Sequence, residues 1–128
     1  MSDTHVVLYG PHGLIEAELP LDRASHEALV TAFLAWKNPD LEPRDSEQIA
    51  LQLTGHARAV VADVRRHAAA LPKSDGRGAL AEVVLREADD RLSAPLEGTP
   101  RCAQNRARLV RALYARLDRL TEPLPAAA

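Results

Sequence analysis

Two histidines and an aspartate recur at helical spacing in the middle of the chain, at His56, Asp63 and His67. Separations of seven and four residues return to nearly the same angle around a helix, so these side chains are expected along one flank of an apolar stripe. An imidazole beside a carboxylate is suited to general-base catalysis near neutral pH. The alternative is that all three are boundary residues half in solvent. Their spacing matches no stringent zinc motif, so we expect no metal and no cofactor.

A second group of charged residues lies further along the chain. Glu87 and Arg91 are four residues apart and can pair on one helix, and Arg106 falls in the middle of an apolar face. A buried arginine needs partners, so we expect Glu87, Arg91 and Arg106 to form a network. Its surplus positive charge can bind a substrate carboxylate, for which arginine is better suited than lysine. The alternative is an internal salt bridge that fixes helix register.

Three aromatic or imidazole side chains are further candidates for substrate binding. His12 lies at the tip of a predicted hairpin, beside Tyr9, and loop tips often carry functional residues. Trp36 lies at a predicted helix end, where an aromatic residue more often closes a core. An exposed turn histidine without a role is the alternative for His12.

The composition limits the fold to one domain. The chain has 128 residues, of which 46% are hydrophobic but only 3% aromatic, so a core of alanine, leucine and valine in helices is expected. The single Cys102 forms no internal disulfide and is expected in the core. Neither a signal segment nor a membrane span is evident, which predicts a cytoplasmic protein.

Several function classes lack their motifs here. We find no glycine-rich phosphate loop, no Gly-x-Ser-x-Gly elbow and no cysteine pair. The stretch from Pro100 to Leu120 contains six arginines and one acidic residue, Asp118. This excess of positive charge suits an acidic partner or a solvated helix face. Nucleic acid is an unlikely partner, because aromatic residues are not interleaved with the arginines and the net charge is -2.

The chain is expected to be a mainly α, four-helix bundle-like domain with a short N-terminal β-hairpin. The hairpin occupies residues 1–20, the helical core residues 21–120 and a frayed tail residues 121–128. The expected helices run from Asp22 to about Trp36, from a capping box at Asp45 and Gln48 to Leu71, from Leu80 to about Leu92, and from the cap Thr99 to Leu120. Their apolar stripes include Leu29, Phe33 and Trp36 on the first helix and Leu80, Val84, Leu85, Ala88 and Leu92 on the third. The hairpin would leave an apolar edge unless it packs on the helices or pairs with its copy, and the second option predicts a homodimer.

Three segments carry a resemblance to a known group of proteins: VVLYGPHGLIEAEL near the start, LREADDRL from Leu85, and RARLVRALYARL from Arg106. In size and layout the chain resembles small actinobacterial helical proteins of natural-product clusters, in particular the lysinoalanine-forming proteins of the duramycin and cinnamycin group. The resemblance implies a cofactor-free cyclase that adds a lysine amine to a dehydroalanine in a modified lanthipeptide.

In the scheme that the resemblance implies, a hydroxyaspartate carboxylate of the peptide substrate helps to remove the amine proton, while the protein brings amine and alkene together. Arg106 or a neighbouring arginine would hold the carboxylate, and His12, His56 or His67 would contact the peptide or relay a proton. Two alternatives stay open: a non-catalytic interaction or scaffold protein, and a weak nucleic-acid binder.

Overall fold

A computed structural model describes residues 23–123, which form four α-helices and, within that range, no strand. The predicted hairpin, with Tyr9 and His12, lies outside the described residues, and the homodimer stays a prediction. The helices are α1 (Arg23–Ala35), α2 (Pro43–Ala69), α3 (Gly76–Leu92) and α4 (Pro100–Thr121). The prediction of a mainly helical chain is therefore confirmed.

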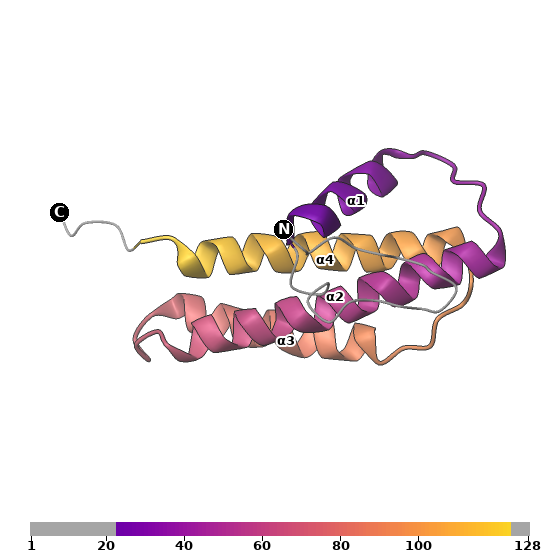
Figure 1. Cartoon of the computed structure of the whole chain (residues 1–128). Helices are drawn as coiled ribbons and strands as arrows, with labels where there is room; N and C mark the ends of the chain where they lie inside the picture. The colour runs from indigo at the N-terminus through magenta and orange to yellow at the C-terminus, as the bar shows by residue number, and fades with distance from the viewer. Residues whose placement is uncertain (1–22, 124–128) are drawn as a thin grey trace, which may run out of the picture.

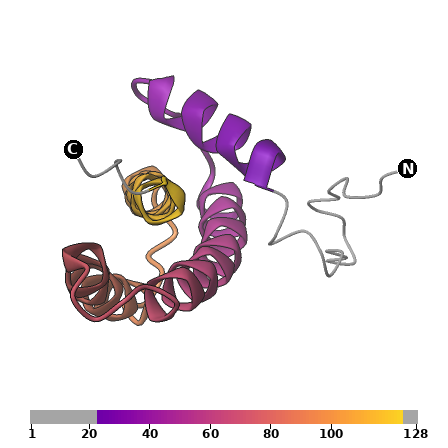
Figure 2. The same ribbon diagram turned by 90° about the vertical axis from the view of Figure 1, so that its left-hand side faces the viewer.

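Helix α4 is the central element. Its most extensive contact is with α2, and it also packs on α1 and α3. Seen end-on, α1, α2 and α3 form an arc around α4, with α1 and α3 on different sides of it (Figure 2). Helices α2, α3 and α4 run alongside one another, whereas α1 diverges from α4 toward its own C-terminal end (Figure 1).

Small and branched aliphatic side chains form the core, as the composition predicts. Six alanines are buried to 1% exposure or less, and they let the helices approach closely. They are Ala50, Ala57, Ala81, Ala88, Ala103 and Ala107. Leu53, Leu85 and Leu113 are the largest fully buried apolar side chains and join α2, α3 and α4. Among residues 23–123, no helix has the length and apolar character needed to cross a membrane.

The helix starts follow capping chemistry, with two departures from expectation. Thr99 caps α4 as predicted, because its hydroxyl accepts from the backbone N–H of Cys102 at 3.1 Å. Helix α2 begins at Pro43, and its N-cap Glu42 makes no side-chain cap bond. The predicted capping box at Asp45 is wrong, because proline is favoured at the first helical position and starts the helix two residues earlier.

Helix α3 begins at Gly76 and not at Leu80. Asp75 caps it by accepting from the backbone N–H of Arg77 at 3.0 Å, and the Arg77 side chain returns to the same carboxylate. Hydrogen bonds from that side chain hold the pKa of Asp75 below its ordinary value. The glycines that appeared to be stop signals therefore lie in the first turn of the helix, where the cap offsets their low propensity.

Candidate functional site

The predicted catalytic trio does not form one exposed cluster. His56 is 1% exposed, whereas Asp63 and His67 are partly exposed. Asp63 pairs with Arg66 on the same helix, at 2.9 Å. The seven residues between His56 and Asp63 separate them by about 10 Å along the helix axis. His56 is therefore not the boundary residue that its spacing suggested, and within residues 23–123 no three metal-ligating side chains gather.

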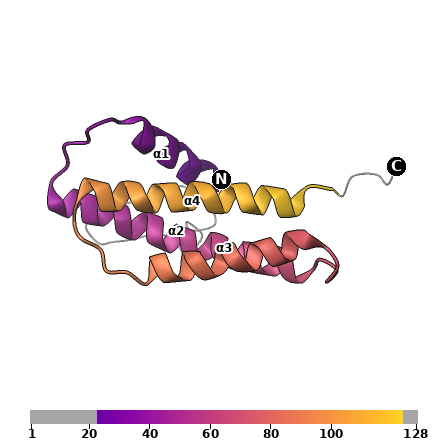
Figure 3. The same ribbon diagram turned by 180° about the vertical axis from the view of Figure 1, so that it is seen from behind.

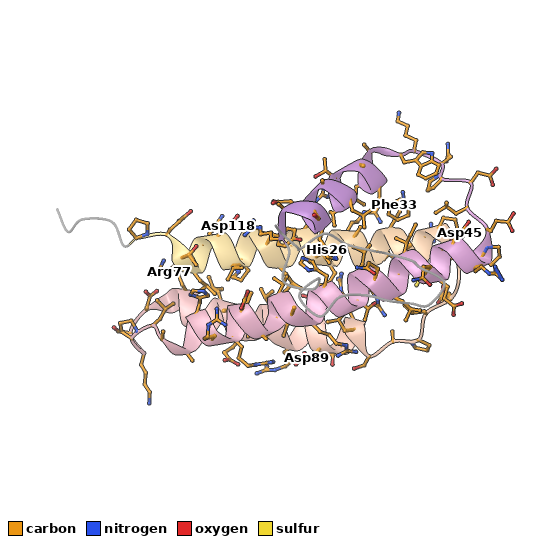
Figure 4. The ribbon with its side chains drawn as sticks, viewed as in Figure 1. His26, Phe33, Asp45, Arg77, Asp89 and Asp118 are labelled. Carbon is orange, nitrogen blue, oxygen red and sulfur yellow. The ribbon has the colours of Figure 1, made fainter. Side chains whose placement is uncertain are left out.

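His56 instead belongs to a buried polar cluster between α1, α2 and α4. Its ring stacks on that of His26, with 3.9 Å between ring centroids and 6° between planes. Its Nε2 is hydrogen-bonded to the Tyr114 hydroxyl, and Nε2 of His26 lies 3.0 Å from Nε2 of Gln52. Figure 4 shows His26 beneath α1, facing the helices that carry its partners.

Arg23 closes this cluster at the solvent side. Its guanidinium lies 4.4 Å from the centroid of the Tyr114 ring and donates to Asp118 at 2.7 and 3.0 Å. These hydrogen bonds raise the pKa of Arg23 and hold the pKa of Asp118 below its ordinary value. The first turn of α1 is thus tied to α4 by a cation over an aromatic ring and by an ion pair.

The predicted network of Glu87, Arg91 and Arg106 forms only in part. Glu87 and Arg91 pair at 3.0 Å, as expected. Arg106 is buried, as its position on the apolar face predicts, but it does not bond to Glu87. Its three hydrogen bonds go to Thr54 Oγ1 at 3.0 Å, to the carbonyl oxygen of Arg91 at 2.6 Å and to that of Ala94 at 2.9 Å.

Arginine side chains therefore satisfy the C-terminal ends of neighbouring helices. Arg58 on α2 donates to the carbonyl of Leu92, which adds to the bonds of Arg106 at the end of α3. Arg77 on α3 donates to the carbonyls of Arg119 and Glu122 at the end of α4. Carbonyls at a helix end lack intrahelical partners and attract positive charge, so no acidic partner is needed for Arg106.

Two adjoining hollows run between α3 and α4, which lie side by side in Figure 3. They share Arg91 and Leu109, and we call them together the α3/α4 groove. The first has a volume of about 360 Å³ and the second about 420 Å³. The floor of the first is apolar and consists of Val84, Ala88, Leu109, Ala112 and Ala115.

Charged side chains line the first hollow, with the paired Glu87 and Arg91 on the α3 side. Arg116 and Arg119 stand on the α4 side, and neither guanidinium has an ion pair within residues 23–123. The Nε of Arg116 is buried and has no hydrogen-bond partner in the same range. A buried donor without a partner is uncommon, and a ligand in the hollow would bond to this atom only after a shift of the Arg116 side chain. The second hollow is lined by Cys102, Asn105, Glu97 and Arg106.

Two exposed apolar side chains lie on α3 outside the lining of the two hollows. Leu80 is 56% exposed and precedes Val84, a residue of the apolar floor, by one helical turn. Val83 is 59% exposed and precedes Glu87 by one turn. The prediction that Leu80 points into the core is wrong, because α3 turns its buried side, with Ala81 and Leu85, toward α2 and α4.

The model of a family of unknown function, DUF6415, matches residues 24–122. The chain belongs to DUF6415. The matched region covers all four helices except Arg23, the first residue of α1, so the His26–His56–Tyr114 contacts and the α3/α4 groove lie within the family domain. No curated protein and no solved structure matches this DUF6415 chain.

Trp36 lies just beyond α1 in the DUF6415 domain and not on its apolar stripe. It is 47% exposed and packs edge-on against Phe33, with 6.3 Å between ring centroids. Its backbone carbonyl accepts from Gln104 on α4. It does not line the groove, since no residue of α1 or of the loop after it lines either hollow.

Sequence reasoning missed Arg116 and Arg119 as groove residues and His26 as a buried residue. Helical spacing suggests that these two arginines lie on a solvated face of α4. It does not show which residues of that face border a neighbouring helix. A signal for His26 was present: it precedes the buried Val30 by one turn, and Val30 precedes the buried Phe33 by three residues.

Proposed function

We propose that this protein binds a carboxylate-bearing peptide in the α3/α4 groove and promotes its lysinoalanine cyclisation. The observation that carries the binding step is Arg116, which lines the first hollow beside an apolar floor and has no ion pair within residues 23–123. A guanidinium binds a carboxylate through two parallel hydrogen bonds, and such charge-assisted bonds are stronger than neutral ones.

The size and lining of the groove favour a peptide segment. Hollows of about 360 and 420 Å³ fall in the range of small-ligand sites, so each accommodates a few side chains. The apolar floor and the exposed Leu80 and Val83 provide contacts for apolar side chains. Arg116 and Arg119 provide contacts for acids. A segment with apolar residues beside an aspartate or hydroxyaspartate matches this surface.

The proposed reaction is the one that the resemblance to lysinoalanine-forming proteins implies. In lysinoalanine formation the lysine nitrogen bonds to the β-carbon of dehydroalanine, the carbon–carbon double bond becomes single, the α-carbon gains a proton and the amine loses one. The predicted histidines His56 and His67 lie on α2, and neither lines the groove. We therefore propose that the substrate carboxylate takes the amine proton, while the groove positions both reacting groups.

Binding is tested with a dehydrated, hydroxylated lanthipeptide that carries a fluorophore. We expect Arg116→Gln to weaken binding at least tenfold, because a charged hydrogen bond contributes about 1.5–3 kcal/mol. Arg111→Gln is the matched control: Arg111 is exposed on the same helix and does not line either hollow. Because both variants lose one positive charge, equal weakening would contradict a specific carboxylate site.

Cyclisation is tested by adding a small thiol after incubation with the same peptide. Free dehydroalanine gains the mass of the thiol, whereas the cross-linked product does not. We expect the native protein to increase the rate of protection from the thiol, and Arg116→Gln to lose most of that increase. Binding without any acceleration would overturn the cyclase step and establish the non-catalytic alternative.

A further inference from the structure

Charge is divided unevenly between the first 22 residues and the helices. Residues 1–22, which lie outside the described residues, hold four of the 18 acidic side chains of the chain and none of its 16 arginines and lysines. The rest of the chain therefore has a net positive charge. Part of that charge lines the α3/α4 groove, at Arg116 and Arg119. The groove and the N-terminal residues are thus of complementary charge.

The end of this N-terminal stretch alternates apolar and acidic residues. We call residues 14–19, with the sequence LIEAEL, the LIEAEL segment. Its two glutamates alternate with three apolar residues, Ile15, Ala17 and Leu19. Successive side chains of an extended chain point to opposite faces, so an extended LIEAEL segment has one apolar edge and one acidic edge. The first hollow has the matching features, an apolar floor and arginines beside it.

The two sides of the first hollow differ in how their charges are compensated. On the α3 side, Glu87 and Arg91 pair at 3.0 Å. On the α4 side, neither Arg116 nor Arg119 has an ion pair within residues 23–123. An acidic segment in this hollow therefore meets two guanidinium groups that no described carboxylate occupies. Each of them can bind a carboxylate through two parallel hydrogen bonds.

The described chain begins close to this hollow. Arg23, its first residue, donates to Asp118 on α4 at 2.7 Å. Asp118 directly precedes Arg119 and lies one helical turn beyond Ala115, and both of these residues line the first hollow. The chain from Glu18 to Arg23 spans up to about 17 Å when extended, which exceeds the diameter of a helix, about 10–12 Å. The LIEAEL segment can thus reach the hollow across the surface of α4.

We propose that the LIEAEL segment binds in the first hollow of its own chain. Its two glutamates, Glu16 and Glu18, bond to Arg116 and Arg119, while its apolar edge packs on the apolar floor. A hollow of about 360 Å³ accommodates a few side chains, which matches an edge of three apolar residues. The predicted hairpin then ends against the helices, which is the alternative to pairing with a second copy.

The segment and the peptide substrate compete for the same groove. This consequence rests on the proposed function, whereas the docking of the segment does not. A segment on a short linker acts at an effective concentration in the millimolar range. The apparent affinity for a peptide is reduced in proportion to the fraction of chains whose groove is open. The N-terminal residues are therefore an internal inhibitor of the groove.

Docking is tested by paramagnetic relaxation in the full chain, without any peptide. Ala17→Cys carries a nitroxide label, and Cys102→Ser leaves this as the single thiol. If the Cys102→Ser chain does not fold, Cys102→Ala replaces it. We expect strong broadening of the backbone amide signals of Val84 and Ala88 on α3, relative to the same protein with the label reduced. Helix α3 lies across α4 from α1, so proximity of the label to Arg23 alone does not produce this pattern (Figure 2).

The matched variant is Glu16→Gln with Glu18→Gln, which keeps the apolar edge and removes the acidic one. We expect it to lose most of the broadening on α3. The control is Glu47→Gln with Asp90→Asn, which removes two charges from exposed positions that line neither hollow and should keep the native broadening. Absence of broadening on α3, or equal broadening in the glutamine variant, would overturn the docking.

A mixed sample separates docking within one chain from docking between two. Isotope-enriched chains without a label are combined with labelled chains at natural abundance, and we expect no broadening of the enriched signals. Broadening in this sample would show that the segment binds a second copy and would overturn the proposal.

Competition is tested with the fluorescent lanthipeptide. We expect the glutamine variant to bind it about threefold or more tightly than the native chain, because the groove is open in more of the molecules. Equal affinities would overturn the inhibitory role. Failure of the lanthipeptide to bind either protein would contradict the proposed function, while broadening on α3 would still establish the docking. The two failures are therefore distinguishable.

Discussion

Arg106 on α4 donates to the backbone carbonyl of Arg91 near the end of α3, with 2.6 Å between Nη1 and the carbonyl oxygen. The same guanidinium holds the carbonyl of Ala94 and the hydroxyl of Thr54, so one side chain joins α2, α3 and α4. Because the carbonyls of Arg91 and Ala94 lie at or just beyond the C-terminus of α3, the positive charge also compensates the negative end of that helix dipole.

Replacing Arg106 with leucine should therefore destabilise the domain. We expect Arg106→Leu to lower the free energy of unfolding by about 2–3 kcal/mol, because two carbonyls and a hydroxyl lose a charged donor. Urea denaturation measures this change. Arg111→Leu, on the exposed face of the same helix, should change stability by less than about 0.5 kcal/mol. An unchanged midpoint for Arg106→Leu would show that these bonds add nothing to stability.

A second prediction concerns the start of α4. Thr99→Ala removes the hydroxyl that accepts from the N–H of Cys102, and we expect it to cost about 1 kcal/mol in thermal or urea unfolding. Thr121→Ala is the control, because that hydroxyl donates back to the carbonyl of Asp118 on its own helix and caps no N-terminus. Equal effects of the two substitutions would contradict a specific capping role for Thr99.

Two leucines distinguish the core from the groove. Leu113 is fully buried, whereas Leu80 is 56% exposed beside the apolar floor of the groove. We expect Leu113→Ala to cost about 3 kcal/mol in urea unfolding and Leu80→Ala less than about 0.5 kcal/mol. Leu80→Ala should instead weaken peptide binding. A large loss of stability for Leu80→Ala would place that side chain in the core, as the sequence first suggested.

The residues show where sequence reasoning was sufficient. The cap and the apolar face of α4 were predictable, because Thr99 followed by Pro100 is a strong start signal and burial dictates the spacing of Leu109, Leu113 and Leu120. The burial of Arg106 followed from the same spacing. Its partners did not, because periodicity gives the direction of a side chain and not the atoms that lie opposite it.

Helix α3 shows why other residues could not be placed. Leu80 and Val83 are apolar but exposed, so its apolar residues lie on both its buried and its exposed side. Pattern alone therefore assigns Leu80 wrongly. The stack of His26 on His56 brings together residues thirty positions apart in different helices, and no local signal marks such a pairing. Sequence spacing consequently grouped His56 with Asp63 and His67, on its own helix.

The final prediction concerns the Arg23–Asp118 pair and acid. The folded pKa of Asp118 is lowered, so the unfolded carboxyl takes up its proton first as the pH falls. The contribution of the pair to stability is therefore complete above about pH 5, declines from about pH 4 downward and disappears once Asp118 is protonated in the folded state too. Because the Asp118 side chain is 56% exposed, we expect that contribution to be less than about 1 kcal/mol. Urea unfolding should separate Asp118→Asn from the native chain by a constant difference between pH 5 and pH 8, and by a difference that shrinks steadily as the pH falls below about 4. A difference in unfolding free energy between the two proteins that grows toward low pH would contradict the expected loss of the ion pair in acid.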